Sequence, residues 1–263
     1  MTMTVTFHPP DGNHSKTKDI RLVPDVQALD EIDISMHGSP TTGYHMGSDC
    51  SDWFSSCFGY DVELLYVGAN RREVLGNLSP NKPASWLQSA KQLTGISAGD
   101  HEQGLGLSDC AALLVVSETS LRHVSRMLPD DLEGDITKFR PNVVLSGAEH
   151  EYEEDFWSEI AVNGNKLLLT ANCNRCVSLN IDYKTGDFAT GPPGTVLKSL
   201  MKERRVDEGA KYSPVFGRYG FVEKQAHGAS IKVNDPASVT DTIAERTKFC
   251  KRNSAHYNLD VTD

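Results

Sequence analysis

The chain has 263 residues, a length that suits one large domain or two small ones and allows a substantial buried core. Its formal net charge is -10, which disfavours nucleic acid and anionic lipid as partners because their fields would repel it. Hydrophobic residues make up 38%, and no run approaches the roughly 18 apolar residues of a membrane span. Residues 1–10 resemble neither a secretory signal nor an arginine-rich transit peptide. We therefore expect a soluble intracellular protein, cytoplasmic by default.

The first 67 residues are predicted to form short strands and one helix. Extended segments with β-branched or alternating residues lie at 5–7, 20–23, 32–35 and 62–67. Ser48 is a suitable N-cap for a helix through Phe58, and Gly59 would end it. The helical spacing predicts that three residues of this helix face the core: Trp53, Phe54 and Cys57.

Residues 68–108 show little periodicity and are rich in Gly, Ser, Asn and Pro. Such a composition is typical of a connecting segment, and one helix is expected near Trp86. We therefore place the boundary between two domains in this stretch.

The second half of the chain has stronger patterns. Residues 111–116 form an apolar run that predicts a buried strand, and Ser117 is a suitable N-cap for the helix that follows. Three residues at helical spacing form the apolar stripe by which that helix would pack on the core: Leu121, Val124 and Leu128. Further strands are predicted at 142–145, 166–170, 177–181, 216–222 and 229–233, and a helix at 196–204. Beyond Asp235 the chain becomes polar, and we expect a loosely held tail. This order predicts a β-rich α+β protein, with helices packed outside a mostly antiparallel barrel or sheet.

Six cysteines occur along the chain: Cys50, Cys57, Cys110, Cys173, Cys176 and Cys250. In a reducing compartment thiols stay free, and the length and spacing also argue against a disulfide framework. The most informative pair lies in the segment Cys173-Asn174-Arg175-Cys176, at the connection between two predicted strands.

Four interpretations of this pair remain open. Structural zinc needs four ligands, and the chain has no second Cys or His pair at a suitable spacing. A dithiol redox motif normally begins a helix, whereas a strand is expected after Cys176. A single thiolate bound to a soft metal fits the adjacent Arg175, whose charge favours ionised sulfur. Both residues could also be ordinary core cysteines.

Five motifs occur in an order that resembles a known family: 139–144 (FRPNVV), 153–157 (EEDFW), 173–176 (CNRC), 182–186 (DYKTG) and 213–217 (SPVFG). They resemble the MOSC domain of mitochondrial amidoxime-reducing components and of the C-terminal part of molybdenum cofactor sulfurase, from about residue 108 to Val233. Residues 17–67 resemble the later half of the β-barrel domain that precedes MOSC in these proteins.

The resemblance implies a MOSC β-barrel with peripheral helices, preceded by a partial MOSC N-terminal β-barrel domain. The expected boundaries are 1–78 for the partial barrel domain, 79–107 for a linker, 108–235 for the MOSC domain and 236–263 for the polar tail.

The resemblance also implies the site. In the family the second cysteine of the Cys-x-Arg-Cys motif ligates molybdenum, and that position is Cys176. Arg140 and Asn142 match positions that line the pterin site, and Asn174 and Arg175 match positions next to the cofactor. Many relatives have Ser where Asn174 stands. A planar guanidinium suits an anionic dithiolene-phosphate group, and amides suit the edge of the pterin.

Other motif positions have simpler explanations. Asp155 is interpreted as a turn acid and Trp157 as a core residue, and the segment from Asp182 to Gly186 as a hairpin turn. Residues 213–217 are interpreted as the start of a strand with close packing.

The function implied is that of a molybdenum-cofactor-dependent oxidoreductase that reduces N-hydroxylated or N-oxide substrates by oxygen-atom transfer. The cofactor carries the redox chemistry and the protein positions it. Electrons would come from a separate reductase or b-type cytochrome, and mitochondrial association is implied by the family. Two alternatives remain: a non-catalytic carrier or sulfuration accessory of the cofactor, and an interaction module without activity.

The sequence departs from the family in several respects. It lacks the family's Lys-Ser pair and Gly-Leu-x-x-Asp-Arg-x-Trp motif, the membrane anchor, and the pyridoxal-phosphate-dependent domain of the sulfurase. We therefore expect an N-terminally shortened member that holds the cofactor weakly, because donors for its phosphate end are missing. Substitute donors would be Lys82, Lys91 or Arg246.

Overall fold

The computed structural model describes residues 1–80, 104–129 and 132–249. These residues form two compact units, and each is described by itself. The smaller unit comprises residues 1–73 and 104–108, and the larger unit comprises 74–80, 109–129 and 132–249. Every helix in these ranges is too short or too polar to span a lipid bilayer.

The smaller unit contains two small antiparallel sheets, one short helix and a 3-10 turn, η1 (Val26–Ala28). One sheet pairs β1 (Thr2–Phe7) with β2 (Lys16–Arg21), and the other has the order β3 (Glu31–Met36), β4 (Ser39–His45) and β5 (Leu65–Tyr66). Assignment of this unit to a partial MOSC N-terminal barrel stays a prediction.

The helix of the smaller unit, α1 (Ser48–Phe58), ends as expected at Gly59, which adopts the left-handed conformation with φ 78°. Its N-cap is Gly47, one residue before the expected cap. The expected core face is wrong in part, because Trp53, Phe54 and Cys57 are only half-buried. The buried residues of the helix are Cys50 and Ser51.

The structure describes both ends of the expected connecting segment. Arg72 and Leu105 form an antiparallel bridge, and a 3-10 turn, η2 (Gly76–Leu78), belongs to the larger unit. The helix expected near Trp86 lies outside the described residues.

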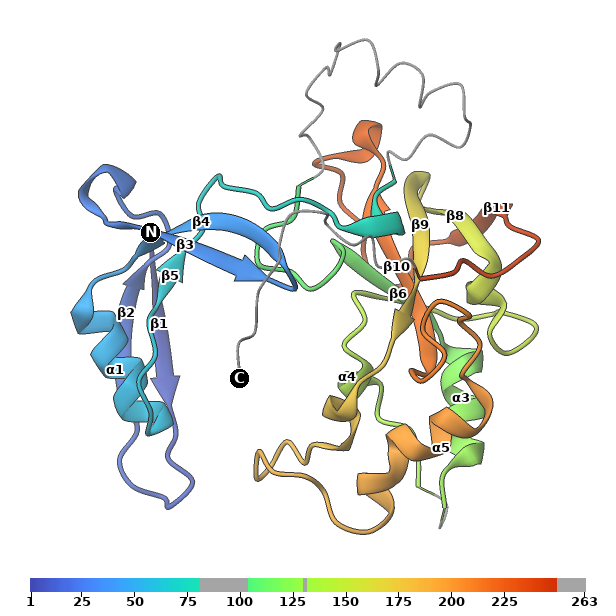
Figure 1. Cartoon of the computed structure of the whole chain (residues 1–263), viewed down its shortest axis with the longest axis horizontal. Helices are drawn as coiled ribbons and strands as arrows, with labels where there is room; N and C mark the ends of the chain where they lie inside the picture. Colours follow the sequence, from blue (N-terminus) through green and yellow to red (C-terminus); the bar gives the residue numbers. More distant parts are fainter. Residues whose placement is uncertain (81–103, 130–131, 250–263) are drawn as a thin grey trace, which may run out of the picture. The chain divides into compact units, whose positions relative to one another are not determined.

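The larger unit is built on a six-stranded sheet with the order β11-β8-β9-β10-β6-β7 (Figure 1). Neighbouring strands are antiparallel except β6 and β7, which are parallel. The strands are β6 (Leu113–Ser117), β7 (Val143–Leu145), β8 (Trp157–Val162), β9 (Asn165–Asn174), β10 (Val215–Val222) and β11 (Ala237–Thr242). The helices are α3 (Glu118–Met127), α4 (Ile136–Phe139) and α5 (Val196–Glu203). Besides η2, the described part of this unit has four 3-10 turns: η4 (Glu153–Phe156), η5 (Val177–Asn180), η6 (Pro192–Thr195) and η7 (Lys224–Ala226).

Three predictions for this unit are wrong. Residues 177–181 alternate like a strand, but they form the turn η5, in which Leu179 is buried and Val177 is 49% exposed. Residues 229–233 form no strand and are exposed throughout. The segment expected as a loose tail contributes β11, which pairs with β8 through backbone hydrogen bonds. All six residues of β11 are exposed, so its sequence has no buried face to reveal it.

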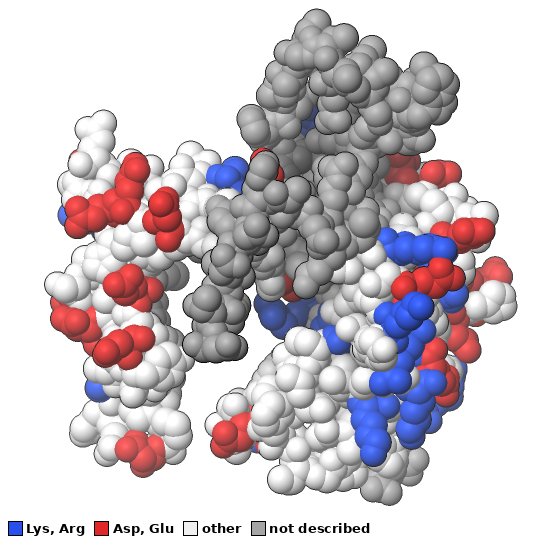
Figure 2. Space-filling model, viewed as in Figure 1, with Lys and Arg blue, Asp and Glu red and all other residues white. Residues whose placement is uncertain are grey.

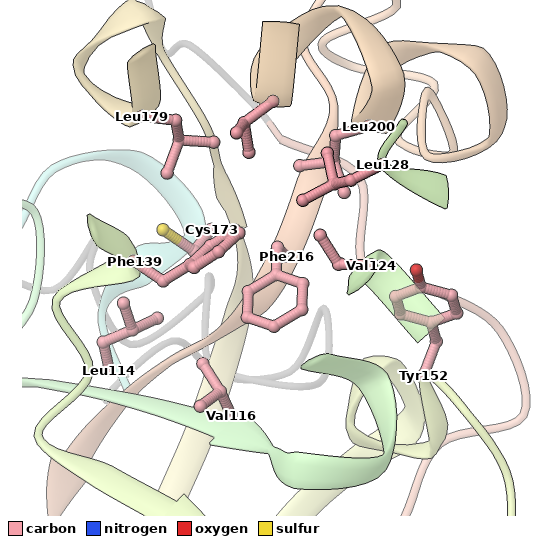
Figure 3. Close-up of a cluster of buried hydrophobic side chains, with 11 residues drawn as sticks. Leu114, Val116, Val124, Leu128, Phe139, Tyr152, Cys173, Leu179, Leu200 and Phe216 are labelled. Atoms are coloured by element: carbon pink, nitrogen blue, oxygen red, sulfur yellow. The ribbon is translucent and has the colours of Figure 1, made fainter. Parts of the chain in front are cut away.

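One face of the sheet packs against the helices. Its core cluster contains Leu114 and Val116 from β6, Phe216 from β10 and Cys173 from β9, which lies beside Phe139 in Figure 3. Ser117 caps α3 as predicted, since its side chain accepts a hydrogen bond from the Thr119 N–H. The predicted stripe of α3 is confirmed at its buried members, Val124 and Leu128.

The other face of the sheet encloses a second apolar cluster. Its buried members come from both ends of the sheet: Val115, Val143, Trp157, Ile160, Val162, Leu167 and Leu169. In a flat sheet β7 and β8 would lie about 19 Å apart, four strand spacings. Their residues share one cluster because the sheet curls into a half-barrel. The β-rich α+β class is therefore confirmed.

Strand β10 bends where its pairing register with β9 shifts, between Val215 and Arg218. Gly217 lies at this point with φ 81°, and a Cβ there would approach Val116 Cγ1 to 2.6 Å. Glycine is therefore required both for the backbone conformation and for the close contact. This confirms the close packing expected for residues 213–217.

Beside the sheet lies a buried group of charged side chains, here called the charge cluster: Asp155, Arg204 and Arg218. Arg204 Nη2 donates to both carboxylate oxygens of Asp155 at 2.8 Å, and its guanidinium lies 3.6 Å from the centroid of the Tyr152 ring. Arg218 is 0% exposed and donates to the backbone oxygens of Asp155 and Leu169. Burial lowers the pKa of Arg218 to about 10, so this residue remains charged at neutral pH.

The charge cluster also binds the segment after β11. Arg246 Nε donates to Asp155 at 2.7 Å, and Arg218 Nη1 lies 3.4 Å from Thr247 Oγ1. Asn172 donates to the Thr247 carbonyl at 2.9 Å. Residues 243–249 are therefore held by buried polar groups, which the polar composition of the segment did not reveal.

Replacing Asp155 tests the charge cluster. Asp155→Asn keeps the size of the side chain but leaves Arg204 without its buried counter-charge. We expect the free energy of unfolding to fall by about 3–5 kcal/mol, the usual effect of breaking a buried ion pair. Urea unfolding measures this change. Asp187→Asn, at an exposed carboxylate, is the matched control and should leave stability nearly unchanged; equal stability of the two variants would contradict the role of the pair.

Glu154, beside the charge cluster, is 0% exposed. Burial raises the pKa of its carboxyl from 4.5 to about 7, although a hydrogen bond from Ser120 opposes the shift. Its Oε1 atom has no hydrogen-bond partner among the described residues. The folded state therefore holds a proton on Glu154 that the unfolded chain would release.

This pKa predicts the sign of a pH effect on stability. Between pH 4.5 and about 7 the folded protein binds more protons at Glu154 than the unfolded chain, so stability should fall as pH rises through this window. Glu154→Gln removes the ionisation, and its free energy of unfolding should decline less over the same range. Urea unfolding at a series of pH values compares them, with Glu149→Gln as the exposed control. A variant whose decline matches that of the wild type would exclude Glu154 as the cause.

Candidate functional site

The two cysteines of the central motif lie in different environments. Cys173 belongs to β9 and is 2% exposed within the apolar core. Cys176 is exposed and forms the N-cap of η5. Both are free thiols, but only Cys176 is exposed to solvent.

The environment of Cys176 favours the thiolate. Partial burial raises the pKa of this thiol, but hydrogen bonds from the Ser178 side chain and backbone, and the charge of Arg175, hold it below its ordinary value. Cys176 Sγ lies 3.1 Å from Ser178 Oγ. A lowered pKa in an accessible thiol is the property that metal binding requires, since the thiolate is the ligand. Ser178 was not identified from the sequence, because residues 177–181 were expected as a strand.

Cys173 has a different set of partners. Arg175 Nη1 donates to its sulfur at 3.0 Å. Nearby, burial raises the pKa of the Cys110 thiol to about 11, with a further contribution from Asp109. Cys110 therefore stays protonated at neutral pH. Among these sulfurs, Cys176 is the accessible one with a lowered pKa.

Arg175 links the cysteine motif to the motif around Arg140. Its Nη2 donates to the Phe139 carbonyl at 2.8 Å, and its guanidinium lies 5.5 Å from the centroid of the Phe139 ring. Arg140 follows directly as the C-cap of α4, in the left-handed conformation with φ 55°. Non-glycine residues rarely adopt this conformation, and strained backbone tends to occur at functional sites. The structure thus brings together two motifs that lie 36 residues apart, as measured from Phe139 to Arg175.

Asn142 has a structural role. Its Oδ1 accepts a hydrogen bond from the Leu114 N–H at 2.8 Å, and its own N–H donates to the Leu114 carbonyl at 2.9 Å. These bonds join β6 to the segment that enters β7. Asn142 therefore holds the backbone that follows Arg140, and a cofactor contact by its side chain stays a prediction.

Two polar atoms of the cysteine motif are buried without a hydrogen-bond partner among the described residues: Asn174 Oδ1 and Arg175 Nε. Leaving such a group unsatisfied costs about 1–3 kcal/mol, so each calls for an explanation. Together with the exposed Cys176 thiol of the same motif, they offer an acceptor, a cationic donor and a soft ligand. This donor set fits a metal-bearing group with an anionic, polar edge.

Other interpretations of the motif receive less support. Among the described residues, neither Cys173 nor Cys176 belongs to a cluster of three or more potential ligands of the His, Cys, Asp and Glu types, as structural zinc would need. The strand expected after Cys176 had argued against a dithiol redox motif. That argument is wrong, because a 3-10 turn follows Cys176 instead. The evidence against a dithiol pair is instead that the two thiols differ in exposure, since Cys173 is buried against Arg175 and Cys176 is exposed.

The remaining candidate residues have structural roles or lie outside the description. Trp157 is buried in the core, as expected. Asp155, expected as a turn acid, does lie in the turn η4, but it is buried as the carboxylate of the charge cluster. Gly186 closes a tight turn by donating its N–H to the Asp182 carbonyl at 2.8 Å. Arg246 is bonded to Asp155, which leaves it poorly placed as a substitute phosphate donor. Two further candidates, Lys82 and Lys91, lie outside the described residues.

Comparison with known families and proteins agrees with this geometry. The MOSC domain matches residues 102–238, just over half of the chain. Human mitochondrial amidoxime-reducing component 1 is 33% identical over 136 residues, which cover 50% of this chain and 38% of that protein. Bovine mitochondrial amidoxime reducing component 2 is 32% identical over 210 residues, covering 78% of this chain and 55% of the relative. The chain thus spans about half the length, or less, of these curated relatives.

The Ser178 hydroxyl provides a test of the site that needs no cofactor. Ser178→Ala removes a hydrogen bond that lowers the pKa of the Cys176 thiol, so that pKa should rise. The pH profile for alkylation of Cys176 by iodoacetamide should therefore move to higher pH, and the rate at neutral pH should fall. Mass spectrometry of the Cys176 peptide gives the rate at each pH.

Ser158→Ala is the control, because the Ser158 hydroxyl bonds to Asp241 instead. Its alkylation profile should coincide with that of the wild type. A Ser178→Ala profile that also coincides would show that Ser178 does not support the thiolate.

Proposed function

Since this chain belongs to the MOSC domain family, we propose that its larger unit binds the molybdenum cofactor and reduces N-hydroxylated or N-oxide substrates. The observation that carries the proposal is the cysteine motif, which combines an accessible Cys176 thiol of lowered pKa with two unpartnered atoms, Asn174 Oδ1 and Arg175 Nε. The names of the relatives, amidoxime-reducing components, supply the substrate class.

Each residue of the site would have a distinct part. Cys176 would hold the metal as a thiolate, and Ser178 would help to keep it ionised. Arg140, exposed and fixed in the left-handed conformation, would contact the anionic part of the cofactor. Asn174 and Arg175 would satisfy its polar edge, while Asn142 would hold the backbone after Arg140.

The reaction proposed is a two-electron reduction. When bound, the cofactor would supply the oxygen-atom transfer chemistry. Overall, an N-hydroxylated substrate takes up two electrons and two protons, its N–O bond breaks, and the products are the N–H compound and water. A separate donor protein, a b-type cytochrome or a reductase, would deliver the electrons one at a time.

Cys176→Ser and Cys173→Ser form a matched pair that tests this function. Protein from a host that makes the cofactor should contain molybdenum and reduce an amidoxime with a chemical reductant such as reduced methyl viologen. Cys176→Ser should lose more than about 100-fold of this activity, because a metal ligand matters at least as much as the groups that orient it. Cys173→Ser should retain molybdenum, since that sulfur is buried against Arg175.

The outcomes separate the candidate functions. Equal activity and molybdenum-centred spectra in wild type and Cys176→Ser would rule out the assignment of the ligand. Stoichiometric molybdenum with no turnover of amidoximes, hydroxamic acids or N-oxides would identify the chain as a carrier of the cofactor rather than an enzyme.

A further inference from the structure

Two packed helices of the larger unit carry most of their exposed charge as cations. On α3, Arg122 and Arg126 lie four residues apart and are exposed. On α5, Lys198 and Lys202 have the same spacing, and Arg205 follows just after the helix. The spacing places each pair on one side of its helix. These five residues, all exposed, are here called the basic face.

The basic face is continuous across the two helices. The helices pack against each other, and His123 of α3 lies 3.6 Å from the carboxylate of Glu203 on α5. Figure 2 shows blue side chains gathered over the part of the larger unit where Figure 1 places α3 and α5, with some red ones beside them. The face is thus one surface rather than two separate stripes.

Three of its five charges form no ion pair among the described residues. The Arg122 guanidinium lies 3.9 Å from Glu118, at the limit of an ion pair, and both side chains are largely exposed. Arg126 lies close enough to Glu151 for its charge to help lower the pKa of that carboxyl. Lys198, Lys202 and Arg205 form no ion pair with any residue that the structure describes. Since the whole chain carries a net charge of -10, this local excess of cations runs against its overall balance.

The composition of the face restricts what it can bind. Within α3 and α5, both fully described, no large apolar side chain is exposed, so nothing on them could insert into a lipid surface. Nucleic acid is a polyanion extended over many charges, so it would run beyond these five cations onto the rest of an acidic chain. A small acidic patch on another protein matches the face in both size and sign. Charge-steered contacts of this kind are typical of transient electron-transfer complexes, which bury little surface.

We propose that the basic face is the docking surface for an acidic electron-donor protein, a conclusion that rests on the proposed function for the identity of the donor. Its place in the fold suits this role. α5 packs against η5, and the Leu197 N–H donates to Asn180 Oδ1 at 3.0 Å. η5 begins at Val177, directly after Cys176. A donor on this face would therefore contact a helix that packs on the segment following the proposed metal ligand.

Charge reversal on α5 tests the docking surface in the full-length, cofactor-loaded protein. The probe is the soluble haem domain of an acidic b-type cytochrome, and titration calorimetry at several salt concentrations measures its affinity. Lys198→Glu/Lys202→Glu should weaken binding about tenfold or more at low salt, and Lys198→Gln/Lys202→Gln should give an intermediate loss. The affinity of the wild type should fall as salt rises.

Arg21→Glu/Lys232→Glu is the matched control. It changes the net charge by the same amount at two exposed positions outside the basic face, and it should bind the probe like the wild type. Thermal unfolding midpoints close to that of the wild type would show that the α5 variants remain folded. If the unfolding midpoint of an α5 variant falls, Arg122→Gln/Arg126→Gln on α3 replaces it in the affinity measurement. This variant should also weaken binding.

Three outcomes would overturn the proposal. One is equal affinity of the reversal variant and its control, and another is wild-type binding that does not respond to salt. The third is binding of the basic face to phosphatidylserine vesicles without binding to the acidic protein. Because affinity is measured without turnover, charge-dependent binding by a protein that reduces no substrate would count against the proposed enzyme activity and leave the docking surface in place.

Discussion

A carboxylate in the interior of a protein must have a counter-charge, and the larger unit is organised around one such group. Asp155 is 0% exposed and is bonded by Arg204 from the end of α5 and by Arg246 from the segment after β11. The backbone carbonyl of Asp155 also accepts a hydrogen bond from Arg218 of β10. Four parts of the chain, far apart in sequence, therefore meet at one residue. Removing any of them would leave a buried charge or polar group without a partner, so they must be present together.

The candidate site depends on a second guanidinium. Arg175 bonds to the Phe139 carbonyl and to Cys173, and so holds the end of β9 against α4. The sulfur of Cys173 is therefore buried, while Cys176 stays exposed at the start of η5. The same arrangement leaves Asn174 Oδ1 and Arg175 Nε without partners in the described structure. A rigid, buried support beneath a few unsatisfied polar atoms is the arrangement expected of a binding site.

The distribution of charge separates the two roles proposed for the larger unit. Buried cations, such as Arg204 and Arg218, bond to carboxylates or carbonyls and hold the fold. Exposed cations gather on α3 and α5, where most form no ion pair among the described residues. The net charge of -10 conceals both groups, since a sum over the chain carries no information about position. A surface for an acidic partner and a site for an anionic cofactor can thus coexist in an acidic protein.

Local sequence determined those features that depend on nearby residues. The apolar run of β6, the Ser117 cap and the stripe of α3 follow from burial and capping within a few residues, and the motifs indicated the family. The alternation at 177–181 predicted a strand, yet the chain turns there because its neighbours bury only Leu179. β11 has no buried face, and only the free edge of β8 makes it a strand. The different fates of Cys173 and Cys176, and the presence of Ser178 at the thiol, likewise depend on how distant segments pack. Burial and hydrogen-bond partners are properties of that packing, so only the tertiary structure could decide them.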